Sequence, residues 1–294
     1  MDLAEFLTER TKQKKTILLD GAMGTQLAEA GCEMGGQNCL NNPETVKDIH
    51  RRYLDCGSDL IITNTLTMNR IYIETHDLGV DVREVNMAGA ALAREVTGPG
   101  QYVLGDISST GKMLKPNGDL AEADAYKVFK EQAAYLAEGG VDGFIVETMF
   151  DLEEALCALR ACRDGAGLPV IASLTFNTVE KGGRTIMGDR AEDCARALTK
   201  EGASVIGSNC GNLDLDESAE IVAMMGNGTS LPIMAKPNAG KPRLVDQKTV
   251  FDTLPAEFAE GIKGCLQAGA GLVGGCCGTS PAHIKAVAEI LDKL

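Results

Sequence analysis

Residues 271–280 read GLVGGCCGTS, a short apolar run that ends in two adjacent cysteines, Cys276 and Cys277, set between glycines. Ser280 and Pro281 follow, and they supply a helix cap with proline at the first helical position. Beyond them, apolar residues recur at helical spacing, at Ile284, Val287, Ala288 and Leu291. The two cysteines are therefore predicted to lie at a strand-to-helix corner.

A second stretch, residues 207–211 (GSNCG), repeats this design and places Cys210 after an apolar run with glycine behind it. Neighbouring side chains of a regular strand point to opposite faces, so two adjacent thiols converge only where the backbone departs from β geometry. Gly274, Gly275 and Gly278 permit that departure. Three thiols can then meet, although from these residues alone core packing or a strained vicinal disulfide is an equal alternative.

Short apolar runs recur eight times along the chain, and helical patterns lie between them. The runs span residues 16–19, 60–64, 102–106, 144–148, 170–174, 205–209, 232–236 and 271–275, and helices are expected over 43–56, behind a cap at Asn42, and over 82–96. Continuous apolar runs are typical of parallel strands buried on both faces. The pattern predicts an α/β fold, a single-domain (β/α)8 TIM barrel over residues 1–294, with residues 1–15 as a short N-terminal helix. A doubly wound sheet is the rival, but no GxGxxG follows the first run.

The composition limits the classes of protein that fit. The chain has 294 residues, 44% of them hydrophobic, which is enough for one large core. It contains neither a signal-peptide pattern nor an apolar run of about 18 residues, so we expect a cytoplasmic protein that does not enter a membrane. Ten cysteines then indicate reduced thiols or metal ligands. A net charge of −14 disfavours nucleic acid and anionic membranes as partners.

Polar residues cluster at the downstream ends of the predicted strands, which form the active face of such a barrel. They are Asp20, Asn64, Asp106, Glu147, Asn177, Cys210, Asn238, Cys276 and Cys277. For Asn64, Asp106 and Asn177, a role as helix cap is an equal alternative. Asp20 and Glu147 close strongly apolar runs, where an unpaired carboxylate is costly, so each is expected to have a cationic partner.

The remaining cysteines and the histidines are expected to be structural. Residues 21–42 form a long connection, predicted to be a mobile loop over the active face, and its Cys32 and Cys39 are interpreted as ordinary thiols. Core packing is the expected role of the cysteines within predicted helices, Cys56, Cys157, Cys162, Cys194 and Cys265. His50, His76 and His283 are expected at the surface.

In a closed barrel, both cysteine segments lie at the same end of their strands, so Cys210, Cys276 and Cys277 converge. Three thiolates with one open position are typical of a catalytic zinc site, and copper(I) is the alternative metal. Their charge leaves such a zinc site at about −1, which suits activation of a thiol better than of water. The expected reaction is alkyl transfer to sulfur.

Five motifs together resemble the homocysteine S-methyltransferase family over nearly the whole chain. They are residues 20–25 (DGAMGT), Glu147-Thr148 with 151–155, 208–210 (SNC), 236–242 (KPNAGKP) and 274–279 (GGCCGT). The residues of these motifs are most similar to those of the homocysteine-binding module of cobalamin-dependent methionine synthase. The resemblance implies a barrel in which homocysteine binds zinc through its sulfur, with Cys210, Cys276 and Cys277 as the zinc ligands.

The resemblance also implies contacts with the amino acid substrate. Asp20 and Glu147 match the acids near its head group, and the backbone amides of Ala22 and Met23 match a turn that binds its carboxylate. Asn238, within the PNAGKP motif, is assigned to substrate binding as well. The two acids thereby gain a cation, the substrate ammonium, and the product is methionine.

The sequence leaves more than one methyl donor open. Methylcobalamin on a separate corrinoid protein is favoured over S-methylmethionine, whereas betaine requires an aromatic cage. The chain has no Trp, and Tyr72, Phe150 and Phe176 are the aromatic residues expected near the active face. A zinc or thiol-redox binding module is the alternative of another class, but such a module has no need of two acids beside the metal.

Overall fold

The computed structural model describes residues 1–245 and 248–293, so positions 246, 247 and 294 of the predicted domain lie outside the described residues. Eight parallel strands form one sheet in the order β1-β10-β7-β6-β5-β4-β3-β2. Their bounds are β1 (Ile17–Leu18), β2 (Leu60–Ile62), β3 (Tyr102–Ile107), β4 (Gly143–Met149), β5 (Val170–Leu174), β6 (Val205–Asn209), β7 (Ile233–Lys236) and β10 (Ala270–Val273). A parallel bridge between Leu19 and Leu60 joins the two edges. The predicted (β/α)8 barrel is confirmed, with a strand at each predicted run.

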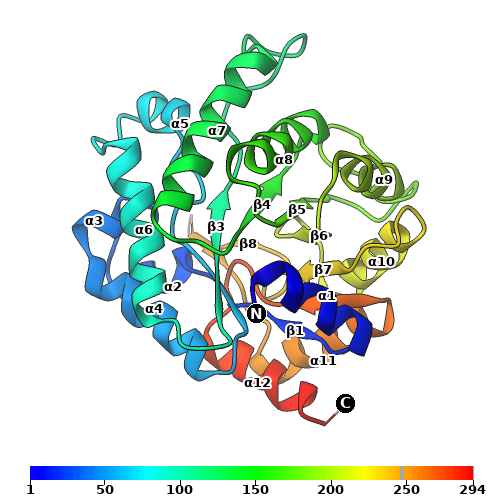
Figure 1. Ribbon diagram of the computed structural model, residues 1–294. Helices are drawn as coiled ribbons and strands as arrows, with labels where there is room; N and C mark the ends of the chain where they lie inside the picture. Colours follow the sequence, from blue (N-terminus) through cyan, green and yellow to red (C-terminus); the bar gives the residue numbers. More distant parts are fainter. Residues whose placement is uncertain (246–247, 294) are drawn as a thin grey trace.

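Helices surround the strands (Figure 1). Their bounds are α1 (Leu3–Gln13), α2 (Gly24–Glu29), α3 (Asn38–Asn41), α4 (Pro43–Asp55), α5 (Arg70–Thr75), α6 (Val82–Val96), α7 (Glu122–Glu138), α8 (Leu152–Ala166), α9 (Ala191–Glu201), α10 (Leu215–Gly226), α11 (Pro255–Gln267) and α12 (Pro281–Leu291). As predicted, α12 begins with Ser280 as N-cap and Pro281 in its first turn. The connection over residues 21–42 contains α2 and α3.

The core has two layers. The outer layer lies between strands and helices and includes Cys157, Cys162, Cys194 and Cys265, whose predicted packing role is confirmed. The inner layer fills the barrel with Ile17, Leu19, Leu60, Ile62, Tyr102, Leu104, Ile145, Ile171, Val205, Met234 and Leu272. Leu3, Phe6 and Leu7 of α1 pack against this inner layer. Helix α1, drawn in dark blue across the barrel in Figure 1, therefore closes the end at which the strands begin.

Two features differ from the sequence-based expectations. Strands β8 (Arg243–Val245) and β9 (Lys248–Val250) pair antiparallel within the connection from β7 to α11, and the sequence did not predict them. The surface placement of His50 and His283 was wrong, because both side chains are buried. Burial lowers the pKa of His50 to about 4, whereas the ring of His283 bonds to Ser280 and Thr253.

None of the helices described for residues 1–245 and 248–293 has the length and apolar character needed to span a bilayer.

Candidate active site

The three predicted cysteine ligands meet at the carboxyl end of the barrel. Cys210 directly follows β6, and Cys276 and Cys277 follow β10. The Sγ atoms of Cys210 and Cys277 are 3.9 Å apart, and all three Sγ atoms lie within 4.8 Å of one another. Neither Cys32 nor Cys39 belongs to this cluster in the described chain.

The backbone around the cysteines is held by the end of β7. Cys210 donates its amide to the Lys236 carbonyl (3.2 Å), and Cys276 donates to the Pro237 carbonyl (2.8 Å). Cys210 has a φ of +56°, a left-handed conformation that costs a residue other than glycine roughly 1–2 kcal/mol. At Gly274, a Cβ would lie 2.8 Å from the Asp20 carbonyl oxygen, so only glycine fits there. The local backbone thus departs from strand geometry where the thiols converge.

The donor set fits a zinc ion. Zn–S bonds of about 2.3 Å place the sulfurs of a tetrahedral site roughly 3.8 Å apart, and the Cys210–Cys277 separation is 3.9 Å. The hydrogen bond with Cys210 lowers the pKa of Cys277, but Cys276 and burial outweigh it and raise that pKa to about 12. A divalent cation removes this penalty, because metal binding favours the thiolate form. Asn209 adds a donor to the Cys276 sulfur (Nδ2···Sγ 3.8 Å).

The cysteines form part of the wall of a cavity of about 350 Å³. Asp20, Ala22, Met23 and Glu147, four of the predicted substrate-binding residues, also line it. The remaining lining residues include Asn64, Tyr72, Asp106, Thr148 and Lys236. The lining of one cavity thus combines thiols with carboxylates.

Lys236, the last residue of β7, is a cationic partner of Asp20 and Glu147. The sequence did not predict this pairing. Its side chain is 3% exposed, and its Nζ lies 3.3 Å from Glu147 Oε2 and 3.9 Å from Asp20 Oδ1. Burial opposes the charge on Lys236, but Glu147 and Asp20 outweigh it and raise the pKa of the lysine. A lysine at the end of a strongly apolar strand was the available sequence signal.

The single ammonium group of Lys236 does not satisfy the carboxyl groups of Asp20, Asp106 and Glu147. Asp20 Oδ2 accepts the Ile62 amide (2.8 Å), but no described group donates to Asp20 Oδ1 or to Asp106 Oδ1, both of which are buried. Burial raises the pKa of Asp20 to about 7, although Lys236 acts in the opposite direction. Burial, together with Glu147, raises the pKa of Asp106 well above its usual range. This wall of the cavity therefore has acceptors for a further cation.

Two of the predicted substrate-binding residues, Ala22 and Asn238, donate hydrogen bonds within the protein. Ala22 lies at the cavity, but its amide is donated to Thr279 Oγ1 (3.0 Å). Asn238 is not among the lining residues of the cavity; its Nδ2 donates to the Gly211 carbonyl (3.0 Å), directly behind Cys210. In this position, Asn238 supports the turn that carries Cys210.

Three polar residues do not cap helices, so that alternative was wrong for them. Asp106 lies within β3, whereas α7 begins at Glu122 behind Ala121. Asn64 donates to the Gly35 carbonyl, and Asn177 pairs through its backbone with Arg184. Asp106 lines the cavity together with Asp20 and Glu147.

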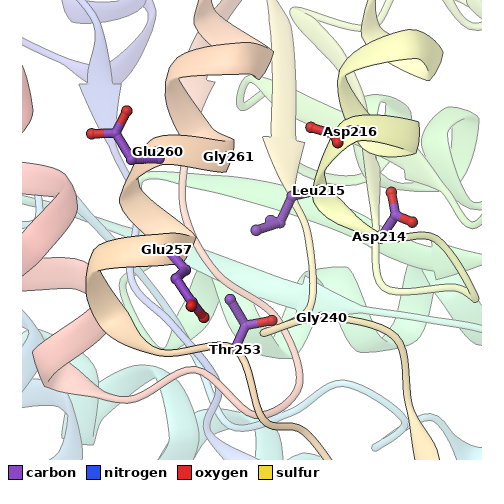
Figure 2. A pocket seen from close by; sticks show the side chains of 8 residues that line it. All are labelled: Asp214, Leu215, Asp216, Gly240, Thr253, Glu257, Glu260 and Gly261. Atoms are coloured by element: carbon purple, nitrogen blue, oxygen red, sulfur yellow. The ribbon is translucent and has the colours of Figure 1, made fainter.

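Figure 2 shows a second cavity, of about 590 Å³, between α10 and α11. Asp214 and Asp216 border it from the start of α10, and Glu257 and Glu260 border it from α11. Asp214 caps α10 in a capping box, and Glu260 pairs with Lys263. Helix capping and surface pairing account for this acidic cleft, which has no thiol and no metal-binding group of side chains in the described structure.

The sequence profile of the homocysteine S-methyltransferase family matches residues 17–291. This chain belongs to that family. The methionine synthase of Mycobacterium tuberculosis is 32% identical over 314 aligned residues, which cover 100% of this chain and 26% of the relative. The methionine synthase of Mycobacterium leprae is also 32% identical, with 99% and 25% covered. The chain thus spans about a quarter of the length of these curated relatives.

Solved structures of low sequence identity share the fold. The metallated form of the homocysteine methyltransferase MmuM from Escherichia coli superposes with a TM-score of 0.78 at 20% identity, covering 97% of this chain and 99% of that one. The carboxyl transferase domain of Rhizobium etli pyruvate carboxylase reaches 0.56 at 16% identity, covering 98% and 49%. The barrel alone does not decide the chemistry of this member of the homocysteine S-methyltransferase family, since proteins of other chemistry share it.

Proposed function

We propose that Cys210, Cys276 and Cys277 hold one zinc ion and that the chain methylates the homocysteine sulfur to give methionine. The observation that carries the proposal is the position of the three thiols and three acids on the walls of one cavity of about 350 Å³. The whole described chain would serve as one homocysteine-binding module. When bound, zinc with three thiolates lowers the pKa of an approaching thiol while leaving its sulfur nucleophilic.

The carboxyl groups bind and orient the amino acid. The substrate ammonium donates to Asp20 Oδ1 and Asp106 Oδ1, the acceptors that have no donor in the described structure. Glu147 interacts with both the substrate ammonium and Lys236. Charge-assisted hydrogen bonds of this kind are the strong ones. The backbone amide of Met23, a residue that lines the cavity, is assigned to the substrate carboxylate. In the transfer, the substrate thiol loses its proton to solvent, the sulfur electron pair forms the new S–CH₃ bond, and the donor keeps the electron pair of its broken bond to the methyl carbon.

Methylcobalamin on a partner corrinoid protein is the proposed donor. Within the described chain, Tyr72 is the single aromatic residue that lines the cavity, and its ring stacks on His76 with centroids 3.9 Å apart. One ring engaged in this way does not make a cage for the quaternary ammonium of betaine. A cavity of about 350 Å³ accommodates an amino acid, whereas a corrin macrocycle has to deliver its methyl group from outside the mouth.

The test is a donor comparison on the zinc-loaded protein. Homocysteine is supplied with methylcobalamin, S-methylmethionine or betaine, and methionine is quantified, with Cys277→Ala as the inactive control and Cys32→Ala as the matched active control. Methionine from methylcobalamin supports the proposal. Turnover of S-methylmethionine or betaine without turnover of methylcobalamin overturns the donor assignment. No methionine from any donor, together with no binding of homocysteine by calorimetry, overturns the function.

A further inference from the structure

The side chain of Asn209 connects the cysteine cluster to the strand that carries Glu147. Asn209 is the last residue of β6, and its side chain is buried. Its Oδ1 accepts from Ser173 Oγ (2.7 Å) and from the Thr148 amide (2.9 Å). Its Nδ2 donates to Thr148 Oγ1 (2.8 Å) and to Cys276 Sγ (3.8 Å). All four hydrogen-bonding positions of this amide are therefore occupied.

Strand β4 is irregular at the point where Asn209 contacts it. Two residues of β4, Glu147 and Thr148, stand opposite a single residue of β5, Ser173, between the regular pairs on either side. Such a bulge redirects the side chains of the strand that contains it. Glu147 and Thr148 accordingly both line the cavity, whereas neighbouring side chains of a regular strand point to opposite faces. The bulge therefore places the Glu147 carboxyl group at the cavity.

The bulge includes an unfavourable backbone conformation. Thr148 has a φ of +60°, which is a clear outlier for a β-branched residue. A conformation of this kind persists only where the surroundings impose it. Asn209 binds Thr148 at both its amide and its hydroxyl group. That amide belongs to the peptide unit shared with Glu147, so the contact also fixes the direction in which Glu147 leaves the strand.

The chemistry of the neighbours determines how the Asn209 amide is oriented. A backbone N–H only donates, so Oδ1 has to face Thr148. Nδ2 is thereby directed at Thr148 Oγ1 and at the Cys276 sulfur, which only accepts once it is a thiolate. Asparagine supplies an acceptor and two donors on one planar group, whereas an aspartate in the same place would have no donor for the sulfur.

A donor at the Cys276 sulfur is relevant to metal binding. A hydrogen bond to a thiolate withdraws negative charge from the sulfur, and such contacts to metal ligands tune both their orientation and their affinity. The backbone of Cys276 is held separately, because its amide donates to the Pro237 carbonyl (2.8 Å). Cys276 is thus fixed at its backbone by the residue after β7 and at its sulfur by β6.

We infer that Asn209 is a positioning residue that fixes the Cys276 thiolate relative to the Glu147 carboxyl group. The inference rests on the proposed function, in which one homocysteine molecule contacts the metal through its sulfur and the acids through its ammonium. The separation between these two contacts has to match the length of the amino acid. Asn209 acts through its neighbours, since it is not among the residues that line the cavity in the described part of the chain.

Two substitutions separate the contacts of Asn209. Asn209→Asp keeps the acceptor oxygen and replaces the N–H that faces Cys276 by a second oxygen, whereas Asn209→Ala removes all four hydrogen bonds. The matched control is Asn86→Asp, at a fully buried asparagine of α6 whose Nδ2 donates to two backbone carbonyls. Thermal melting measures the loss of stability in each variant, so that effects on the site can be compared at similar stability.

The contact to Cys276 is tested with cobalt(II), which occupies zinc sites and absorbs visible light. Sulfur-to-cobalt charge-transfer bands depend on the electron density of the thiolates, so both Asn209 variants should shift these bands to lower energy. In competition with a chelator, Asn209→Asp should bind cobalt about 10–100-fold more weakly than the parent protein. Asn86→Asp should retain the parent bands and affinity. Unchanged bands and affinity in the Asn209 variants, or equal changes in Asn86→Asp, overturn the inference.

The connection to Glu147 is tested by a double-mutant cycle, with the homocysteine Kd measured by calorimetry on zinc-loaded proteins. Asn209→Ala should raise this Kd about tenfold in the parent but about threefold or less in a Glu147→Gln background, because the two residues act through one contact. An equal factor in both backgrounds overturns the coupling. If the parent binds cobalt and homocysteine but forms no methionine, the proposed reaction falls and these variants still decide the role of Asn209. A parent that binds neither removes both proposals.

Discussion

The two ends of the barrel differ in chemistry although the same strands build both. At the end closed by α1, the inner layer carries no charged side chain, and Leu104, Ile145 and Met234 belong to it. Two residues farther along the same strands stand Asp106, Glu147 and Lys236, at the cavity. Side chains two apart in a strand share a face, so the charged layer lies directly above the apolar one. The residues expected to stabilise the fold and those expected to act on substrate therefore lie in adjacent side-chain layers. Variants at the two ends should have separable effects.

The largest effect is expected at the metal site. Replacing Cys276 by Ala removes one of three thiols, so the zinc content should fall from about one per chain to near zero and methionine formation should disappear. Metal analysis by mass spectrometry checks the first effect, and product quantification checks the second. Cys32→Ala is the control, and full zinc occupancy in Cys276→Ala would remove this residue from the ligand set.

The closed end is expected to govern stability without affecting the site. Leu3→Ala leaves a cavity where α1 meets the inner layer, and its side chain is 1% exposed, so unfolding free energy should fall by about 2–5 kcal/mol. Urea titration measures this change, with Leu254→Ala, at a side chain 62% exposed, as the matched control. Zinc content and homocysteine affinity should stay unchanged. A parallel loss of homocysteine affinity would show that the two ends are coupled.

The acids at the open end should affect binding more than stability. Asp20→Asn or Glu147→Gln replaces a charged acceptor by a neutral one, which should weaken homocysteine binding by about 1–3 kcal/mol while zinc content is retained. Asp106→Asn should act in the same direction. Calorimetry on the zinc-loaded proteins is the measurement. Unchanged affinity in all three would leave these acids a structural role only.

The smallest effect concerns pH. Burial raises the pKa of Asp20 to about 7 in the free protein, and an ammonium binds the ionised carboxylate, so affinity should rise as pH increases through that value. Between pH 6 and 8 the contribution of Asp20 should be about tenfold. Because the substrate thiol adds its own pH dependence, the comparison is with Asp20→Asn, whose plot of log Kd against pH should be shallower. Identical slopes in both proteins would contradict the role of Asp20.

The sequence predicted the barrel and the convergence of the three cysteines well because both depend on short local patterns. All eight apolar runs became strands, and the glycines beside Cys276 and Cys277 indicated the bent backbone that brings the thiols together. The β8–β9 hairpin was missed because it packs little of its surface: Leu244 is 76% exposed, and no buried face imposes a pattern.

The contacts across the cavity were not predictable in the same way. Lys236 and Glu147 are 89 residues apart in the chain, and no local pattern states which side chains meet at the mouth of a barrel. The same limit applies to His50, a polar residue on an amphipathic helix that turned out to be fully buried. Histidine is a polar residue and was expected at the surface, but the packing of α4 buries this side chain.

The first and last strands of the barrel are hydrogen-bonded neighbours, and this has a consequence for biosynthesis. The seam pairs Ile17 with Leu272, and the bond from Ala22 to Thr279 spans 257 positions. Cys210 leaves the ribosome 67 residues ahead of Cys277, which at typical translation speeds is roughly 3–13 seconds. Neither the closed barrel nor the three-thiol site exists during that interval. Metal capture is thus expected as the last event of assembly, after the final strand has been inserted between β7 and β1.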